Sequence, residues 1–124
     1  MKGLPFPENP CVYMAVQPID FRLGINGLCG LVRQRMHADV VDAALYLFTN
    51  RRRNRLKVLY WHRNGFCLWL KQLEADRFYW PKIPAASDAN ATLTLTLQQL
   101  EWLLEGIDIS KIQPHPARHY RIQA

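Results

Sequence analysis

Two strand-like runs joined by Arg63, Asn64 and Gly65 constrain the fold of this chain more than any other feature. Residues 56–62 and 66–70 are rich in β-branched, aromatic and aliphatic side chains, which favour extended strands. Asn and Gly both tolerate the positive φ that a tight hairpin turn requires. The pattern predicts a β-hairpin closed either by a two-residue loop at Asn64-Gly65 or by a three-residue loop over residues 63–65, and the two loops give different registers.

Strand alternation divides the first run of this hairpin into two faces. Successive side chains of a strand point to opposite sides of a sheet. One face should therefore combine cations with a large aromatic side chain, and the other should be apolar and belong to the core. The first face comprises Arg55, Lys57, Leu59 and Trp61, and the second comprises Leu56, Val58 and Tyr60.

Four more segments have the pattern of short strands. Residues 11–16, 44–49, 77–80 and 92–95 are apolar or alternating runs bounded by turn-forming residues. The run 44–49 is too continuously apolar for a half-exposed edge, so we place it centrally in the sheet. A helix over residues 66–74 is the alternative to the second hairpin strand, because apolar side chains there also recur at helical spacing.

Two segments have helical signatures. An apolar stripe of helical period predicts a helix that is capped by Asp20 and runs to about Met36. Thr96 and Gln99 have the spacing of a capping box, and Gly106 stands where a helix-terminating glycine belongs. The chain is therefore predicted to be α+β, with a mostly antiparallel sheet of about five strands, a long central hairpin and two helices.

The composition is that of one ordinary globular domain over residues 1–124. Hydrophobic residues make up 49% and charged residues 21%, which argues against a disordered chain. Residues 1–10 hold three of the eight prolines and are predicted to be an extended leading segment, and residues 110–124 are predicted to be a tail that is loosely packed or ordered by a partner. Without a signal-peptide or membrane-spanning pattern, the protein is expected to be soluble and cytoplasmic.

The positive charge is concentrated beside the hairpin. The chain has 16 Lys and Arg against 10 Asp and Glu, a net charge of +6. Residues 51–63 contain six of these basic residues and no acidic residue, so their local surplus equals the net charge of the chain. A localised positive field favours a polyanionic partner, although a charged loop can also serve solubility alone.

Several runs, spread over nearly the whole chain, form a family signature. They are residues 50–61, 64–66, 71–74 and 77–81 in the centre, residues 12–15, Pro18, Asp20, Arg22 and residues 24–28 before it, and residues 100–106 after it. This signature resembles the TnpB-type transposase accessory proteins of the insertion sequence 66 family, which are unrelated to the RNA-guided nuclease of the same name. Ala75-Asp76 stands where that pattern has a residue followed by Gly. The resemblance implies a role in transposition beside a separate transposase, and it supplies no catalytic residues.

Two functions are consistent with this basic, aromatic hairpin. In the first, it contacts DNA phosphates and unstacked bases, for example at transposon ends. In the second, the same surface binds and regulates the transposase without touching DNA. Both functions need Arg and Trp, so the sequence leaves both open, and Trp61 and Trp69 can also be core residues. The candidate nucleic-acid-binding residues are Arg51, Arg52, Arg53, Arg55, Lys57, Trp61, Arg63 and Lys71.

Catalysis, metal binding and cofactors are not expected. No Ser, His or Cys lies in a nucleophile motif, and the carboxylates form no recognisable metal-binding set. Cys11, Cys29 and Cys67 are odd in number and widely spaced, which suits reduced thiols. His115 and His119 are four residues apart but lack further nearby ligands for zinc. The sequence thus predicts a non-enzymatic protein with no membrane or small-molecule partner.

Overall fold

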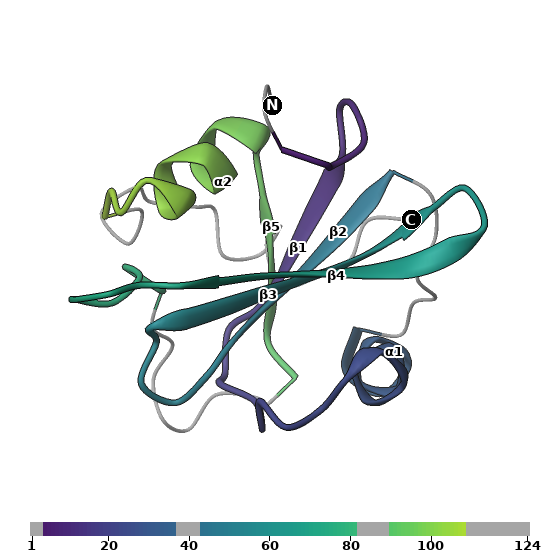
Figure 1. The fold of residues 1–124 in the computed structure, drawn as a ribbon, viewed down its shortest axis with the longest axis horizontal. Helices are drawn as coiled ribbons and strands as arrows, with labels where there is room; N and C mark the ends of the chain where they lie inside the picture. Colours follow the sequence, from purple (N-terminus) through teal and green to yellow (C-terminus); the bar gives the residue numbers. More distant parts are fainter. Residues whose placement is uncertain (1–3, 37–42, 82–89, 109–124) are drawn as a thin grey trace.

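A five-stranded sheet with one helix on each side forms the described part of the chain, residues 4–36, 43–81 and 90–108, in the computed structural model (Figure 1). The elements are β1 (Cys11–Ala15), α1 (Ile25–Met36), β2 (Ala44–Thr49), β3 (Arg55–His62), β4 (Gly65–Gln72), β5 (Thr92–Leu95) and α2 (Leu97–Leu104). The strand order is β4-β3-β2-β1-β5. The predicted α+β class, with its sheet and two helices, is confirmed.

The sheet is mostly antiparallel, and β2 is its middle strand as predicted. Strands β1 and β2 pair in parallel, whereas β1 with β5, β2 with β3, and β3 with β4 pair antiparallel. The parallel pair is joined through α1, because parallel neighbours need a crossover connection. That crossover places β1 on the far side of β2. The hairpin of β3 and β4, predicted at the centre, consequently forms one side of the sheet, and β4 is an edge strand.

The β3–β4 hairpin closes in neither of the two predicted registers. His62 pairs with Gly65, so Arg63 and Asn64 form the turn, and Arg63 takes the positive φ of 56°. The helical alternative for this segment is wrong, since β4 is a continuous strand over residues 65–72. In the observed register, the core-facing side chains of β3 and β4 lie on the same face of the sheet. Their burial against the rest of the core selects one of the turns that the local sequence allows.

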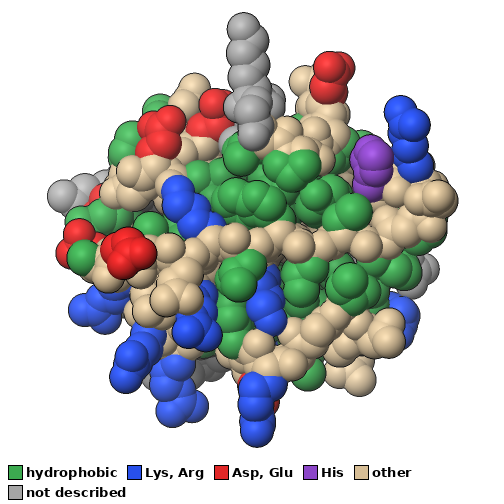
Figure 2. All heavy atoms as spheres, in the orientation of Figure 1, with side chains coloured by type: hydrophobic (Ala, Val, Ile, Leu, Met, Phe, Trp, Pro, Cys, Tyr) green, Lys and Arg blue, Asp and Glu red, His purple; other side chains and the backbone are tan. Residues whose placement is uncertain are grey.

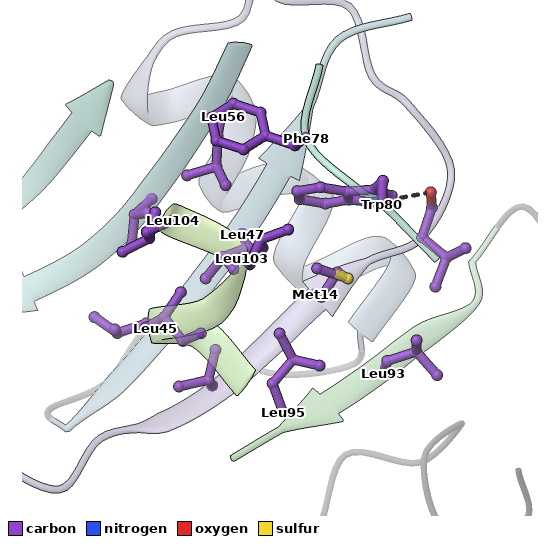
Figure 3. Close-up of a cluster of buried hydrophobic side chains, with 14 of the residues drawn as sticks. Met14, Leu45, Leu47, Leu56, Phe78, Trp80, Leu93, Leu95, Leu103 and Leu104 are labelled. Carbon is purple, nitrogen blue, oxygen red and sulfur yellow. Dashed lines mark hydrogen bonds between the residues drawn. The ribbon is translucent and has the colours of Figure 1, made fainter. Parts of the chain in front are cut away.

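The core on the α2 side of the sheet includes a segment that was predicted to be a strand. Residues 77–80 are irregular, and they place Phe78 and Trp80 in the core, 2% and 3% exposed (Figure 3). The indole Nε1 of Trp80 donates to the backbone carbonyls of Ala15 and Val16, at 3.2 and 3.1 Å. Before this segment Asp76 has φ 65°, the conformation that the family's glycine would adopt without strain.

The first helix begins later than the sequence predicts. Asp20 is not its N-cap, because the Asp20 carboxylate accepts from the amide and guanidinium of Arg22, with Nη2 to Oδ2 at 2.7 Å. Helix α1 begins at Ile25, and the carbonyl of Gly24 accepts from the amide of Leu28 at 2.9 Å. The helix covers the opposite face of the sheet from α2, where it builds a second core.

The second helix has the capping predicted for it. The Thr96 hydroxyl accepts from the Gln99 amide at 3.0 Å, and the Gln99 side chain accepts from the Thr96 amide at 2.9 Å. Gly106 follows the C-cap residue Glu105 with φ 84°. Neither helix of the described chain is long and apolar enough to cross a membrane.

Candidate nucleic-acid interface

The connection between β2 and β3 presents a group of arginines on a fixed backbone. We call residues 50–55 the basic turn; it contains Arg51, Arg52, Arg53 and Arg55. The Asn50 side-chain oxygen accepts from the backbone amides of Asn54 and Arg55, each at 3.1 Å, and its nitrogen donates to the Asn54 side chain at 2.7 Å. These bonds hold the backbone of the turn without using any of its arginine side chains.

The four arginines of the basic turn are not equivalent. Arg51, Arg52 and Arg55 are exposed, whereas Arg53 is half-buried with φ 59°. The Arg53 carbonyl accepts from the amide of Phe78 at 2.7 Å, and its buried Nε has no hydrogen-bond partner among the described residues. Arg53 thus joins the turn to the segment that follows β4.

That contact brings Arg77 to the basic turn. Arg77 directly precedes Phe78 and is exposed, so a fifth arginine lies next to the basic turn along this backbone contact. Sequence reasoning missed it, because Arg77 lies more than twenty residues from the turn along the chain. Its only signal was that residues 77–81 belong to the same family signature as the turn. In the described structure none of these five arginines forms an ion pair with a carboxylate, and Arg22–Asp20 is the salt bridge found there.

A groove of about 760 Å³ lies beside the basic turn. Its walls are residues 17–21 on one side and Asn50, Arg51 and Arg52 on the other. The amide of Ile19 donates to the carbonyl of Thr49 at 3.0 Å, which ties the first wall to the end of β2. One wall of the groove is therefore tied to the sheet, and the other includes two exposed arginines.

Asp20 contributes a carboxylate to this groove, but Arg22 compensates its charge. Hydrogen bonds from Arg22 are the main cause that lowers the pKa of Asp20 to about 2. The carboxylate is consequently ionised at neutral pH and paired with a cation. The net charge contributed by Asp20, Arg22, Arg51 and Arg52 is +2, so the groove favours an anion.

Lys57, a predicted nucleic-acid-binding residue, is part of the internal structure instead. Its ammonium donates to the carbonyls of Phe21 and Leu23 at 2.8 and 2.9 Å and lies 4.5 Å from the centre of the Phe21 ring. Burial is the main cause that lowers the pKa of Lys57, followed by repulsion from Arg55. The connection before α1 covers this part of the cationic face, so the Lys57 ammonium is directed into the fold and not toward solvent.

Lys71 is likewise engaged within the fold. Its side chain points to the opposite face of the sheet from Lys57, and its ammonium donates to the carbonyl of Leu104 at 2.8 Å. Leu104 is the last residue of α2, whose carbonyl end attracts a cation. Lys71 therefore fixes α2 onto the sheet and is removed from the candidate interface.

Trp61 and Arg63 lie at the other end of the hairpin from the basic turn. Trp61 is half-buried and packs edge-on against Phe66, with ring centres 4.9 Å apart, and Arg63 is exposed in the β3–β4 turn. The eight residues of β3 separate the two ends by roughly 25 Å. Figure 2 shows Lys and Arg side chains gathered at the lower left, where Figure 1 places the basic turn. Most of the exposed cations of the hairpin thus lie at the end that carries the basic turn, and Arg63 lies at the other end.

The described residues offer no metal site. They contain no group of three or more His, Cys, Asp and Glu side chains that could hold a metal ion. The three cysteines are free, and burial raises the pKa of the Cys29 thiol, which disfavours the reactive thiolate. His115 and His119 lie outside the described residues.

Comparison with known families identifies the chain. A family described as IS66 Orf2 like protein matches residues 11–114, a range that includes every described helix and strand. The chain belongs to the IS66 Orf2-like family. This confirms the resemblance stated from the sequence signature, and membership in the IS66 Orf2-like family implies an accessory role in transposition.

Two proteins of Sinorhizobium fredii (strain NBRC 101917 / NGR234) are similar to this IS66 Orf2-like chain. Uncharacterized protein y4jC is 30% identical over 107 residues, which cover 86% of this chain and 87% of that protein. Uncharacterized protein y4hO is 32% identical over 105 residues, which cover 85% of this chain and 87% of that protein. No solved structure matches the chain.

Proposed function

We propose that this protein is a non-catalytic accessory factor of bacterial DNA transposition that binds the DNA backbone through its basic turn and acts beside the element's transposase. The observation that carries the proposal is the exposure of Arg51, Arg52 and Arg55 on a turn whose backbone is fixed by Asn50. Arg77 extends this surface from a different part of the chain.

Phosphate contacts suit this geometry better than base contacts. Arginine guanidinium groups bind phosphate oxygens through paired hydrogen bonds, and such contacts position a protein on DNA without selecting sequence. A turn held by its own hydrogen bonds loses little freedom on binding, which favours association. We therefore expect binding to both transposon-end and unrelated duplexes, with similar affinities and a strong dependence on salt.

The salt dependence gives a quantitative test. If Arg51, Arg52, Arg55 and Arg77 each meet a phosphate, log affinity should fall with log salt concentration with a slope of about −3 to −4. The double variant Arg51→Gln, Arg52→Gln should weaken binding to every duplex and flatten this slope by roughly two. Fluorescence anisotropy of labelled duplexes over a series of salt concentrations measures both quantities.

A matched control removes the same charge elsewhere. Arg33 and Arg35 lie on α1, outside the basic turn, so Arg33→Gln, Arg35→Gln lowers the net charge by the same amount. Its effect on the slope should be small, because the slope counts the phosphates that the protein neutralises and these two arginines make none of the proposed phosphate contacts. Equal losses in the two double variants, or no DNA binding by the unmodified protein, would refute the proposed contact.

The partner and the absence of catalysis are tested separately. Co-purification at low salt should recover the element's transposase with this protein, and deletion of its gene should reduce transposition. If Arg51→Gln, Arg52→Gln abolishes transposase association and leaves DNA binding unchanged, the basic turn binds protein instead of DNA. Metal-dependent cleavage of transposon ends that is lost with one of this chain's own carboxylates would show the protein to be an enzyme.

A further inference from the structure

Among the described residues, none pairs its backbone with the outer edge of β4. No strand of the described structure lies beyond β4, which is eight residues long, whereas the opposite edge strand β5 has four residues. The Leu73 amide donates to the Asn54 carbonyl at 2.9 Å, so Leu73 and every second residue before it direct their backbone groups toward β3. The residues between them direct their backbone groups away from β3. These residues are Phe66, Leu68, Leu70 and Gln72.

This edge lacks the features that normally prevent strand addition. The pairing of β3 with β4 runs without a bulge, and β4 contains no proline. Its one charged side chain, Lys71, donates to α2 on one face of the sheet. Phe66 and Leu70 are 42% and 53% exposed on the other face. Figure 2 shows hydrophobic side chains on both sides of the backbone that crosses the view where Figure 1 places β4.

Charged side chains flank β4 at both ends. Arg63, with His62 beside it, precedes the strand, and Glu74 and Asp76 follow it. All four side chains are exposed, and in the described structure none of them forms an ion pair. An antiparallel second copy of β4 would bring Arg63 of each chain toward Glu74 and Asp76 of the other, at the end of the strand where Arg77 and the basic turn also lie. A parallel copy would place like charges together, which is unfavourable.

We propose that two copies of this chain pair antiparallel along β4, so that their two sheets become one continuous sheet. A two-fold axis perpendicular to the sheet relates the copies, and the contact is closed because it uses the same edge on both. In the register centred on Leu68, Phe66 of each copy lies opposite Leu70 of the other. The two exposed apolar side chains of the strand thereby bury each other.

The dimer does not depend on DNA binding, but it affects where the cations lie. Gln72 pairs with Arg55 within one chain and lies opposite Asn64 of the second copy in this register. Arg63 of the second copy therefore approaches the end of β4 that adjoins the basic turn. Pairing would unite cations that a single chain holds at opposite ends of the hairpin.

Sedimentation velocity of the full chain, without DNA, tests the proposal over roughly a hundredfold range in protein concentration. We expect a dimer of twice 14.5 kDa that dissociates on dilution. Phe66→Lys, Leu70→Lys changes two exposed side chains and gives the edge the charges that disfavour strand addition, so this variant should be a folded monomer. Circular dichroism confirms its folding.

A second test, which exchanges the charges of Arg63 and Glu74, does not depend on the Phe66→Lys, Leu70→Lys variant. Arg63→Glu and Glu74→Arg should each weaken dimerisation about tenfold, because each change occurs twice in the symmetric contact. The combined variant should restore the affinity of the unmodified protein. Any of three results would overturn the proposal: the unmodified protein is a monomer at every concentration, the Phe66→Lys, Leu70→Lys variant is still a dimer, or the combined charge variant does not restore dimerisation. An edge that binds only transposase would overturn it as well.

Discussion

Replacing Lys57 by Met tests the assignment of this lysine to the internal structure. The side chain is 9% exposed and makes two hydrogen bonds to carbonyls of the connection before α1. A hydrogen bond from a charged donor contributes about 1.5–3 kcal/mol, and a cation–π contact contributes about 0.5–1 kcal/mol. The cost of burying the ammonium offsets part of this sum. We expect Lys57→Met to lower the free energy of unfolding by about 2–4 kcal/mol.

This loss is measurable by urea denaturation and by thermal unfolding. For a domain of this size about 1 kcal/mol corresponds to roughly 4 °C, so the melting temperature should fall by about 8–16 °C. At a temperature where the variant is folded, its DNA affinity and salt slope should equal those of the unmodified protein. The stability effect and the binding effect are thereby separated.

Arg52→Gln is the matched control, because it also removes one cation but from an exposed side chain. It should change the free energy of unfolding by less than about 0.5 kcal/mol and flatten the salt slope by about 0.9. The reasoning fails if folded Lys57→Met flattens the slope as Arg52→Gln does, since Lys57 would then contact phosphate. It also fails if Lys57→Met leaves stability unchanged.

Two further predictions concern single groups. Trp80→Phe removes the donor for two buried carbonyls at the end of β1 and should cost about 1–3 kcal/mol in urea denaturation, whereas the neighbouring exposed Tyr79→Phe should cost less than about 0.5 kcal/mol. The pKa of Asp20, followed by NMR, should be about 2 and should move toward its ordinary value of 3.8 in Arg22→Gln. The pKa of Asp20 is lower in the folded than in the unfolded protein, so the stabilisation from this pair is present above about pH 4 and is lost as the pH falls through 2. An unchanged pKa of Asp20 in Arg22→Gln would contradict the assigned cause.

The sequence by itself determined the features that depend on neighbouring residues. A continuous apolar run located the strand from Ala44 to Thr49, and the spacing of Thr96 and Gln99 located the start of α2. The exposed arginines of the basic turn follow from a charged run between two strands. In each case the deciding interaction lies within a few residues along the chain, so a local pattern contains it.

The tertiary structure decided the hairpin register and the availability of each cation. Arg55 and Lys57 lie on the same face of β3, yet one is exposed and the other is bound to carbonyls 34 and 36 residues away in the sequence. Lys71 is bound 33 residues away, and Arg77 reaches the basic turn through the contact of Phe78 with Arg53. Such partners meet only when the sheet and helices pack, and therefore no local pattern distinguishes a cation that is free to bind DNA from one that holds the fold together.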